Sequence, residues 1–116
     1  MSQPADTLHV KTTTTGGTHV VNVAGEIDLR TSPRLRVLLL ESASKLSGPL
    51  LLDLSGVSHM DSSGVGTMVY VKREVERSGR RLVLIGLQPR VRSVLEITHL
   101  DKFFLIVQNV DEVPKS

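Results

Sequence analysis

The sequence predicts a single α/β domain in which an amino-terminal hairpin and then parallel strands form a mixed central sheet, with about three to four helices. The 116 residues suit one domain, which is long enough to bury a core without disulfides. Short apolar runs alternate with amphipathic segments of helical length, and this order is typical of strand–helix–strand units with right-handed crossovers. The expected order of elements is ββαβαβαβ.

The hairpin is expected from residues 8–11 and 20–24, which are strand-like in composition. Gly16-Gly17 supplies a turn at little steric cost, and the threonines at 12–15 suit the end of the first strand. One domain is expected to occupy residues 1–116. Within it, residues 1–6 are expected to be a flexible amino terminus and residues 109–116 a short carboxyl-terminal tail or helix.

Three helices are expected between the later strands. The first begins at about Ser32, capped by Thr31 or Ser32 itself, and ends before Gly48-Pro49. The second begins at Ser62 and the third after Gln88, each with apolar residues at helical spacing. The remaining strands are expected at residues 50–54, 82–85 and 103–107, and the first two are apolar runs that suit buried strands.

The sharpest local signal is the run of residues 60–66, Met-Asp-Ser-Ser-Gly-Val-Gly, where a loop after a strand becomes a helix. The first amides of a helix have no partners within it, and the peptide dipoles make that end partly positive. Ser62, or alternatively Asp61, is expected to cap the helix there. A phosphate on Ser62 would be held by the same amides.

Parallel strands place their carboxyl-terminal loops on one edge of the sheet. Residues 25–28, Gly-Glu-Ile-Asp, follow the second strand, so this loop should lie on the same edge as the run at 60–66. Asp28 is therefore an expected neighbour of Ser62. Asp53 interrupts an apolar strand, and we expect a structural role in which its carboxylate accepts hydrogen bonds from loop amides.

Composition argues against several partners. A formal charge of +2 gives no case for direct nucleic-acid binding, and the few aromatic residues do not form a stacking surface. The basic residues at 72–81 are expected to form a solvated helix face. The absence of cysteine excludes a disulfide framework and suits a reducing cytoplasm. No secretion signal and no apolar run of about 20 residues is found, so we expect a cytoplasmic protein that does not bind membranes.

Catalysis by this chain is not expected. The four histidines lack metal-ligand spacing, so no metal or cofactor site is expected. Ser62 lacks the preceding glycine of a nucleophile elbow, and Gly64-Val65-Gly66 is not followed by the Gly-Lys-Ser/Thr of a triphosphate site. A small hydrolase with Ser62 as nucleophile remains an alternative, which would lose turnover in Ser62→Ala.

Residues 25–28, 52–55 and 61–66, taken together in this order and spacing, resemble the STAS domain of bacterial anti-anti-sigma factors. The likeness spans nearly the whole chain. It implies an anti-sigma factor antagonist that, when unphosphorylated, binds an anti-sigma serine kinase, an ATPase of the histidine-kinase-like fold, and so frees a sigma factor. The kinase phosphorylates the antagonist, and a metal-dependent serine phosphatase reverses this step.

The resemblance also implies roles for single residues. The phosphate acceptor is the hydroxyl residue after the aspartate, here Ser62, with Ser63 as the alternative. Asp28 belongs to the kinase-facing surface. The expected partner-binding residues are Asp28, Asp61, Ser62, Ser63, Gly64 and Gly66.

Other interpretations of these residues stay open. Ser63 also suits hydrogen bonding to its own backbone, and Gly64 and Gly66 suit either the approach of a partner or tight packing of the helix start. A STAS-like scaffold or transporter-associated subunit, docked constitutively and never phosphorylated, is the alternative function. Self-association is left undecided. With Pro114 so near the end of the sequence, the carboxyl-terminal helix common in the family is expected to be short or absent.

Overall fold

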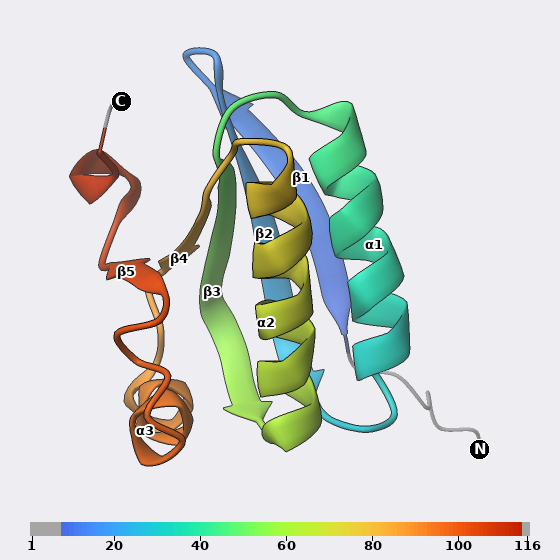
Figure 1. Ribbon diagram of the computed structural model, residues 1–116, viewed down its shortest axis with the longest axis vertical. Coiled ribbons are helices and arrows are strands. Elements are labelled where there is room, and N and C mark those ends of the chain that lie inside the picture. Colours follow the sequence, from blue (N-terminus) through green and yellow to red (C-terminus); the bar gives the residue numbers. More distant parts are fainter. Residues whose placement is uncertain (1–7, 115–116) are drawn as a thin grey trace.

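The computed structural model describes residues 8–114 and contains one five-stranded sheet in the order β1-β2-β3-β4-β5 (Figure 1). The elements are β1 (His9–Thr15), β2 (Thr18–Ile27), α1 (Ser32–Lys45), β3 (Leu50–Met60), α2 (Ser62–Arg77), β4 (Leu82–Ile85), α3 (Pro89–Ile97), β5 (Leu105–Val107) and a 3-10 turn, η1 (Val110–Glu112). β1 and β2 are antiparallel and the other pairs are parallel. The predicted mixed α/β sheet is confirmed. The expectation of a flexible terminus at residues 1–6 lies outside the described residues.

The main core lies between the sheet and the three helices. Each crossover moves one strand further in the same direction, so right-handed connections place α1, α2 and α3 on one face. In Figure 1, α1 and α2 lie side by side over β1, β2 and β3. The core side chains on this face are apolar and almost wholly buried; they include Ile27, Leu35, Leu39, Leu52, Leu54, Met60, Met68, Val71, Val91 and Leu95.

The opposite face of the sheet carries a smaller apolar cluster, formed by Val20, Leu51, Val83 and Ile85. Among the described residues no helix of the three covers this face. Val113, just after η1, packs on the cluster instead. We call this side of the sheet the open face. In the described part of the chain, no helix is long and apolar enough to cross a bilayer.

Strands β2 and β3 extend further than the sequence predicted. Residues 25–27 and 55–60 were expected in loops, but Glu26 pairs with His59 and Ile27 with Met60 in a parallel ladder that contains register shifts. Gly25 has φ of 112°, a conformation that favours glycine at such an irregularity. The loop expectation was wrong because pairing between the strands continues through polar residues that carry no apolar pattern.

The last strand is shorter than expected. β5 begins at Leu105 rather than Phe103, and the ring of Phe103 packs edge-on against that of Phe104 at 5.2 Å between centroids.

The basic residues at 72–81 were expected to face solvent, but not all of them do. Arg80 Nη1 donates to Ala43 O and Arg80 Nε to Gly48 O, both at 2.7 Å. Arg80 therefore ties the end of α2 to the end of α1, where a cation suits the helix dipole.

Candidate functional site

Two loops meet at the edge of the sheet where β2 and β3 end (Figure 1). The Asp61 amide donates to Ile27 O at 3.1 Å, and the hydroxyls of Ser32 and Ser63 are 2.9 Å apart. These contacts join the entry of α1 to the entry of α2. The topology predicted that the loop of Asp28 would lie near Ser62, and in the structure Asp28 is close enough for its charge to act on Asp61, the residue before Ser62. We call this region the loop edge.

Asp28 is held in place by its own loop. Its Oδ1 accepts hydrogen bonds from the amides of Arg30 at 2.9 Å and Thr31 at 3.3 Å. Its Oδ2 accepts from the Arg30 guanidinium at 2.8 Å. That side-chain hydrogen bond is the largest cause of a lowered pKa of Asp28. Glu26 lies 3.5 Å from the same guanidinium, so one cation faces two carboxylates.

Thr31 does not cap α1 with its side chain, contrary to expectation. It occupies the N-cap position, but its hydroxyl donates to Glu26 O at 2.8 Å and accepts from the Asp28 amide at 3.0 Å. The Asp28 carbonyl instead accepts from the amides of Thr31 and Ser32. Thr31 is wholly buried, so its hydroxyl closes the loop and satisfies polar groups that water does not reach.

Asp61 is the cap of α2. Its Oδ1 accepts from the Ser63 amide at 2.9 Å, the Gly64 amide at 3.3 Å and the Ser63 hydroxyl at 2.5 Å. Burial of the carboxyl raises its pKa, but the hydrogen bonds from Ser63 and Gly64 outweigh burial and the nearby charge of Asp28, so the net pKa of Asp61 is lowered. Ser62 was the first expectation for this cap, and it is wrong; the alternative, Asp61, holds.

The cap by Asp61 also makes the start of α2 less suitable for binding an anion. The sequence predicted that the first amides of α2 would hold a phosphate on Ser62. In the structure, Asp61 Oδ1 already occupies the amides of Ser63 and Gly64. A phosphate at this position would meet a carboxylate rather than open donors, and Asp28 lies near enough for its charge to act on Asp61.

The two neighbouring serines differ in exposure and in bonding. Ser62 is the first residue of α2, its side chain is exposed, and its hydroxyl makes no hydrogen bond among the described residues. Ser63 is half-buried and its hydroxyl donates to Asp61. Because the hydroxyl proton of Ser63 already forms the hydrogen bond to Asp61, Ser32 is the donor and Ser63 the acceptor in the contact between the two serine hydroxyls.

The two glycines of the motif are not equivalent. A Cβ at Gly64 would lie 2.6 Å from Met60 Cγ and 2.7 Å from Ile27 Cγ2, so the start of α2 packs directly on the ends of β2 and β3. A Cβ at Gly66 would meet nothing within 4 Å. Close packing therefore explains why residue 64 is a glycine. Gly66 is exposed on the outer side of α2, where no side chain covers the helix backbone at that position.

Sequence reasoning missed an exposed apolar side chain at this edge. Leu29 sits between Asp28 and Arg30 and is 78% exposed. On α2, Ser62, Gly66 and Tyr70 follow one another at helical spacing and share the outer face. The one signal for Leu29 in the sequence was an apolar residue inside a polar loop.

Asp53 lies away from this edge. Its Oδ1 accepts from the Ser55 amide at 2.9 Å, so the predicted hydrogen bond exists, although the donor belongs to β3 rather than to a loop. In the described part of the chain, no group of three or more His, Cys, Asp or Glu side chains gathers as metal ligands do.

Comparison with known proteins agrees with this fold. Residues 9–113 match the STAS domain family, and the chain belongs to this family. It is similar to the anti-sigma-B factor antagonist of Staphylococcus aureus (strain NCTC 8325 / PS 47), with 31% identity over 93 residues that cover 80% of this chain and 86% of the relative. The chain is thus a member of the anti-sigma factor antagonists.

Solved structures show the same fold. An anti-sigma factor antagonist from Mycobacterium paratuberculosis is 26% identical and superimposes with a TM-score of 0.81, over 97% of this chain and 94% of that one. The antagonist SpoIIAA in its unphosphorylated form gives 0.71 at 24% identity, over 90% of each chain. SpoIIAA of Bacillus in its phosphorylated form gives 0.65 at 23% identity, over 90% of this chain and 94% of that one.

Proposed function

We propose that this protein, when unphosphorylated, binds an anti-sigma serine kinase and so frees a sigma factor, and that phosphorylation of Ser62 switches it off. The observation that carries the proposal is the position of Ser62. It is an exposed hydroxyl, unbonded among the described residues, directly after the aspartate that caps α2, at an edge where charged and apolar side chains gather.

Ser62 is a better phosphate acceptor than Ser63. A kinase must reach the hydroxyl and remove its proton, and the Ser62 hydroxyl is exposed at the first turn of α2. The Ser63 hydroxyl is half-buried, donates to Asp61 and accepts from Ser32. Phosphorylation of Ser63 would break both contacts and disturb the helix start.

The chemistry of the switch belongs to the partners. The kinase transfers the γ-phosphoryl group of ATP: the bond from phosphorus to the bridging oxygen of ADP breaks, the bond to Ser62 Oγ forms, and the hydroxyl proton passes to a base on the kinase. A metal-dependent serine phosphatase then hydrolyses the ester to restore serine and release phosphate. This chain acts as substrate and ligand, not as enzyme, in the cytoplasm where these partners are found.

The added charge explains why one phosphate is enough to weaken binding to the kinase. It adds about −1.5 to −2 charge at neutral pH, beside Asp61 and in the field of Asp28. A partner fitted to a neutral serine would then have to desolvate a dianion among carboxylates. If this costs as much as an unpaired interfacial charge, about 2 to 5 kcal/mol, affinity falls by about 30-fold to several thousandfold.

The switch requires no change of fold. Ser62 is on the surface, and its phosphate would extend into solvent rather than into the core. SpoIIAA in its phosphorylated and unphosphorylated forms superimposes on this chain with similar TM-scores of 0.65 and 0.71, which supports one architecture for both states. The partner, not the fold, would sense the modification.

The surface around Ser62 has the composition of a docking patch. Leu29 supplies an exposed apolar side chain, Gly66 allows close approach, and Tyr70 is held under the Arg36 guanidinium at 3.9 Å from its ring centre. Asp28 and Asp61 add fixed negative charge. Aromatic and apolar anchors beside charged residues are typical of sites where few residues contribute most of the binding energy.

Phosphorylation mapping tests the assignment of Ser62. The protein is incubated with ATP and each histidine-kinase-like ATPase encoded in the same genome, and then digested with trypsin. The peptide of residues 46–72 contains both Ser62 and Ser63, so fragmentation must place the phosphate within it. We expect one phosphate, on Ser62, from one kinase.

Two variants serve as controls. Ser62→Ala should accept no phosphate yet bind the same kinase, whereas Ser63→Ala should still be phosphorylated. Phosphate on Ser63 would overturn the assignment. Stable docking on a larger assembly with no phosphate transfer from any kinase would favour the constitutive scaffold instead.

A further inference from the structure

The sheet has one long open edge, formed by β1. Within residues 8–114, β1 pairs with β2 only, and its ladder runs from His9 to Thr15 without a register shift. Every residue of β1 except Val10 is exposed. The strand contains no proline, and Lys11 is its one residue charged at neutral pH. Bulges, prolines or several charges usually protect such an edge, because unpaired backbone groups bind another strand. β1 has none of these protections.

Alternate residues of β1 direct their backbone groups away from the sheet. The turn at Gly16-Gly17 has two residues, so the pair that closes it, Thr15 and Thr18, is hydrogen-bonded. Asn22 Nδ2 of β2 donates to Lys11 O at 3.2 Å, so the Lys11 carbonyl also faces β2. Alternation then leaves three residues of β1 whose N–H and C=O groups point outward: Val10, Thr12 and Thr14.

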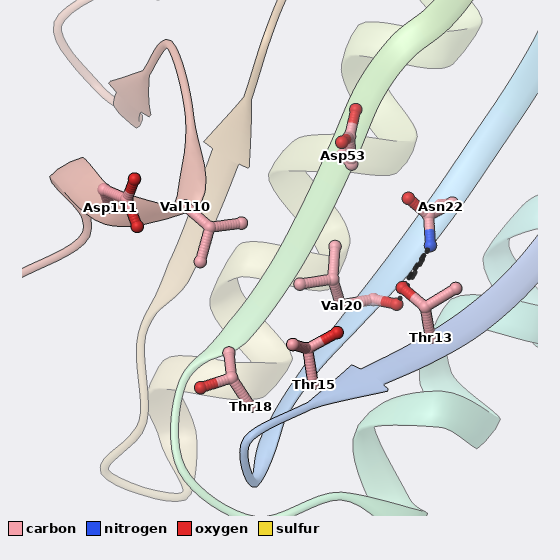
Figure 2. Close-up of a pocket in the computed structure, with 8 residues that line it drawn as sticks. All are labelled: Thr13, Thr15, Thr18, Val20, Asn22, Asp53, Val110 and Asp111. Atoms are coloured by element: carbon pink, nitrogen blue, oxygen red, sulfur yellow. Dashed lines mark hydrogen bonds between the residues drawn. The ribbon is translucent and has the colours of Figure 1, made fainter.

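The side chains of β1 lie on both faces of the sheet. Thr13 and Thr15 line a pocket on the open face (Figure 2). Val10 and Thr12 lie on the other face, where they and α1 border a groove of about 360 Å³. The residues of α1 in this groove are Leu38, Glu41, Ser42, Lys45 and Leu46. We call the outward side of β1 together with this groove the β1 edge.

The β1 strand is complementary to a second copy of itself. In an antiparallel pair centred on Thr12, the outward groups of Thr12 meet those of Thr12 in the other copy, and those of Val10 meet those of Thr14. All outward donors and acceptors of the strand are then paired. This register places Lys11 opposite Thr13, whereas a pair centred on Lys11 would place two lysines opposite each other, which is destabilising.

Charges on α1 favour the same pairing. Glu41 and Lys45 border the groove, are exposed, and form no ion pair with any residue in the range 8–114. A two-fold axis through Thr12, perpendicular to the sheet, places both α1 helices on one face and makes them antiparallel. Glu41 of each copy then lies toward Lys45 of the other, so opposite charges face each other across the axis.

We propose that this protein forms a two-fold symmetric dimer through the β1 edge, with one continuous sheet across both copies. The interface comprises one strand and one helix side from each copy, which is small for a stable complex, so the expected dissociation constant is about 1 to 100 μM. No residue of the loop edge belongs to this surface, and each copy keeps its Ser62 exposed. The dimer is therefore independent of the proposed switch.

Sedimentation equilibrium of the whole protein over about 2 to 500 μM at low salt measures this self-association. Hydrogen exchange at the two ends of the range locates the interface. The amides of Val10, Thr12 and Thr14 should exchange about 4- to 30-fold more slowly at high concentration, whereas that of Thr13, which already faces β2, should change little. A protein that stays monomeric, or protection of these amides only when the kinase is added, would overturn the proposal.

A backbone variant tests the strand pairing. Thr12→Pro removes the outward N–H of both copies at the centre of the pair, and an edge strand tolerates proline where the N–H faces solvent. Dimerisation should weaken by at least about tenfold. Thr12→Val keeps the N–H and should dimerise like the wild type, with thermal unfolding of dilute samples as the check that both variants fold. Equal dimerisation of the two variants would place the interface elsewhere.

Charge exchange on α1 tests the same interface without altering β1. Glu41→Lys and Lys45→Glu each place like charges across the two-fold axis, so each variant alone should dimerise about two- to tenfold more weakly. A mixture of the two restores opposite charges and should recover the affinity of the wild type. Glu96→Lys and Arg92→Glu on α3, which packs on β3, are the matched control and should have no effect, alone or mixed. The same recovery in the control mixture would reduce the attraction to net charge and refute the β1 edge.

Discussion

The amide and the hydroxyl of Ser63 both donate to one atom, Asp61 Oδ1, at 2.9 and 2.5 Å. These two hydrogen bonds hold the start of α2 in place and use the hydroxyl proton of Ser63. It leaves Ser62, one residue earlier, exposed and without a side-chain partner among the described residues. One aspartate thus distinguishes two adjacent serines that look alike in sequence.

Removing this cap should weaken the fold measurably. Asp61→Ala leaves the amides of Ser63 and Gly64 without their side-chain acceptor, and loss of such a cap typically costs about 0.5 to 2 kcal/mol. Asp61→Asn retains an acceptor oxygen and should lose less. Urea unfolding at pH 7 measures both free energies of unfolding. Equal stability of Asp61→Ala and the wild type would show that the cap contributes nothing.

The same carboxylate should make stability depend on pH. The pKa of Asp61 is lowered in the folded protein, and so is that of Asp28. An unfolded aspartate has a pKa of about 3.9. The unfolded chain therefore binds more protons in this range, and stability rises with pH. The stabilisation is present above the unfolded pKa and is lost as pH falls through the lowered values.

Unfolding measured from neutral pH down to about pH 3 provides the check. The difference in free energy of unfolding between the wild type and Asp61→Asn should shrink as the wild-type carboxyl becomes protonated. A difference that stays constant over this range would contradict the lowered pKa of Asp61.

The two glycines of the motif should respond oppositely to alanine. Gly64→Ala places a Cβ within 2.7 Å of Met60 and Ile27 side chains and should destabilise the fold by about 1 to 3 kcal/mol. Gly66→Ala adds its methyl group in open space and should stabilise the helix by about 0.5 to 1 kcal/mol. Thermal unfolding of the two variants measures both effects, and Gly66→Ala serves as the control for Gly64→Ala. A similar loss of stability in both variants would refute the packing role of Gly64.

A negative charge at residue 62 should be felt by its acidic neighbours. Because Asp61 occupies the helix amides and senses Asp28, Ser62→Asp should raise the pKa of both carboxyls through like-charge repulsion. Side-chain carboxyl titration by NMR measures this directly, with Ser62→Asn as the uncharged control. Unchanged pKa values of Asp61 and Asp28 in Ser62→Asp would show that a charge at residue 62 does not act on these carboxyls.

Leu29 should contribute to partner binding but not to stability. Its side chain is 78% exposed, and that of Ile97 at the end of α3 is 77% exposed. Leu29→Ser and Ile97→Ser should each change the free energy of unfolding by less than about 0.5 kcal/mol. Burial of Leu29 against the kinase predicts about 10- to 100-fold weaker binding for Leu29→Ser alone. Equal kinase affinity of the Leu29→Ser and Ile97→Ser variants would show that Leu29 is not part of the interface.

The element order and the loop edge were predictable because they depend on simple patterns. Apolar periodicity located α2 and β4. The rule that parallel strands end on one edge predicted that Asp28 would lie on the same edge as residues 60–66, and Asp28 does act on Asp61 there. The ends of β2 and β3 were not predictable, since pairing of Glu26 with His59 is decided by the neighbouring strand rather than by local composition.

Other features depend on how distant parts of the chain meet, which local sequence does not determine. Asp61 and Ser62 are both good capping residues, and only the position at which β3 stops selects between them. Ser63 also bonds to Ser32, which lies 31 positions earlier in the chain, so local sequence does not reveal this second partner.

The most direct measurement compares the affinity of the anti-sigma serine kinase for this protein with and without a phosphate on Ser62, by calorimetry at one salt concentration. We expect the phosphorylated form to bind at least about 30-fold more weakly, while its backbone chemical shifts change only around the loop edge. Equal affinity of the two forms would show that a phosphate on Ser62 does not control kinase binding.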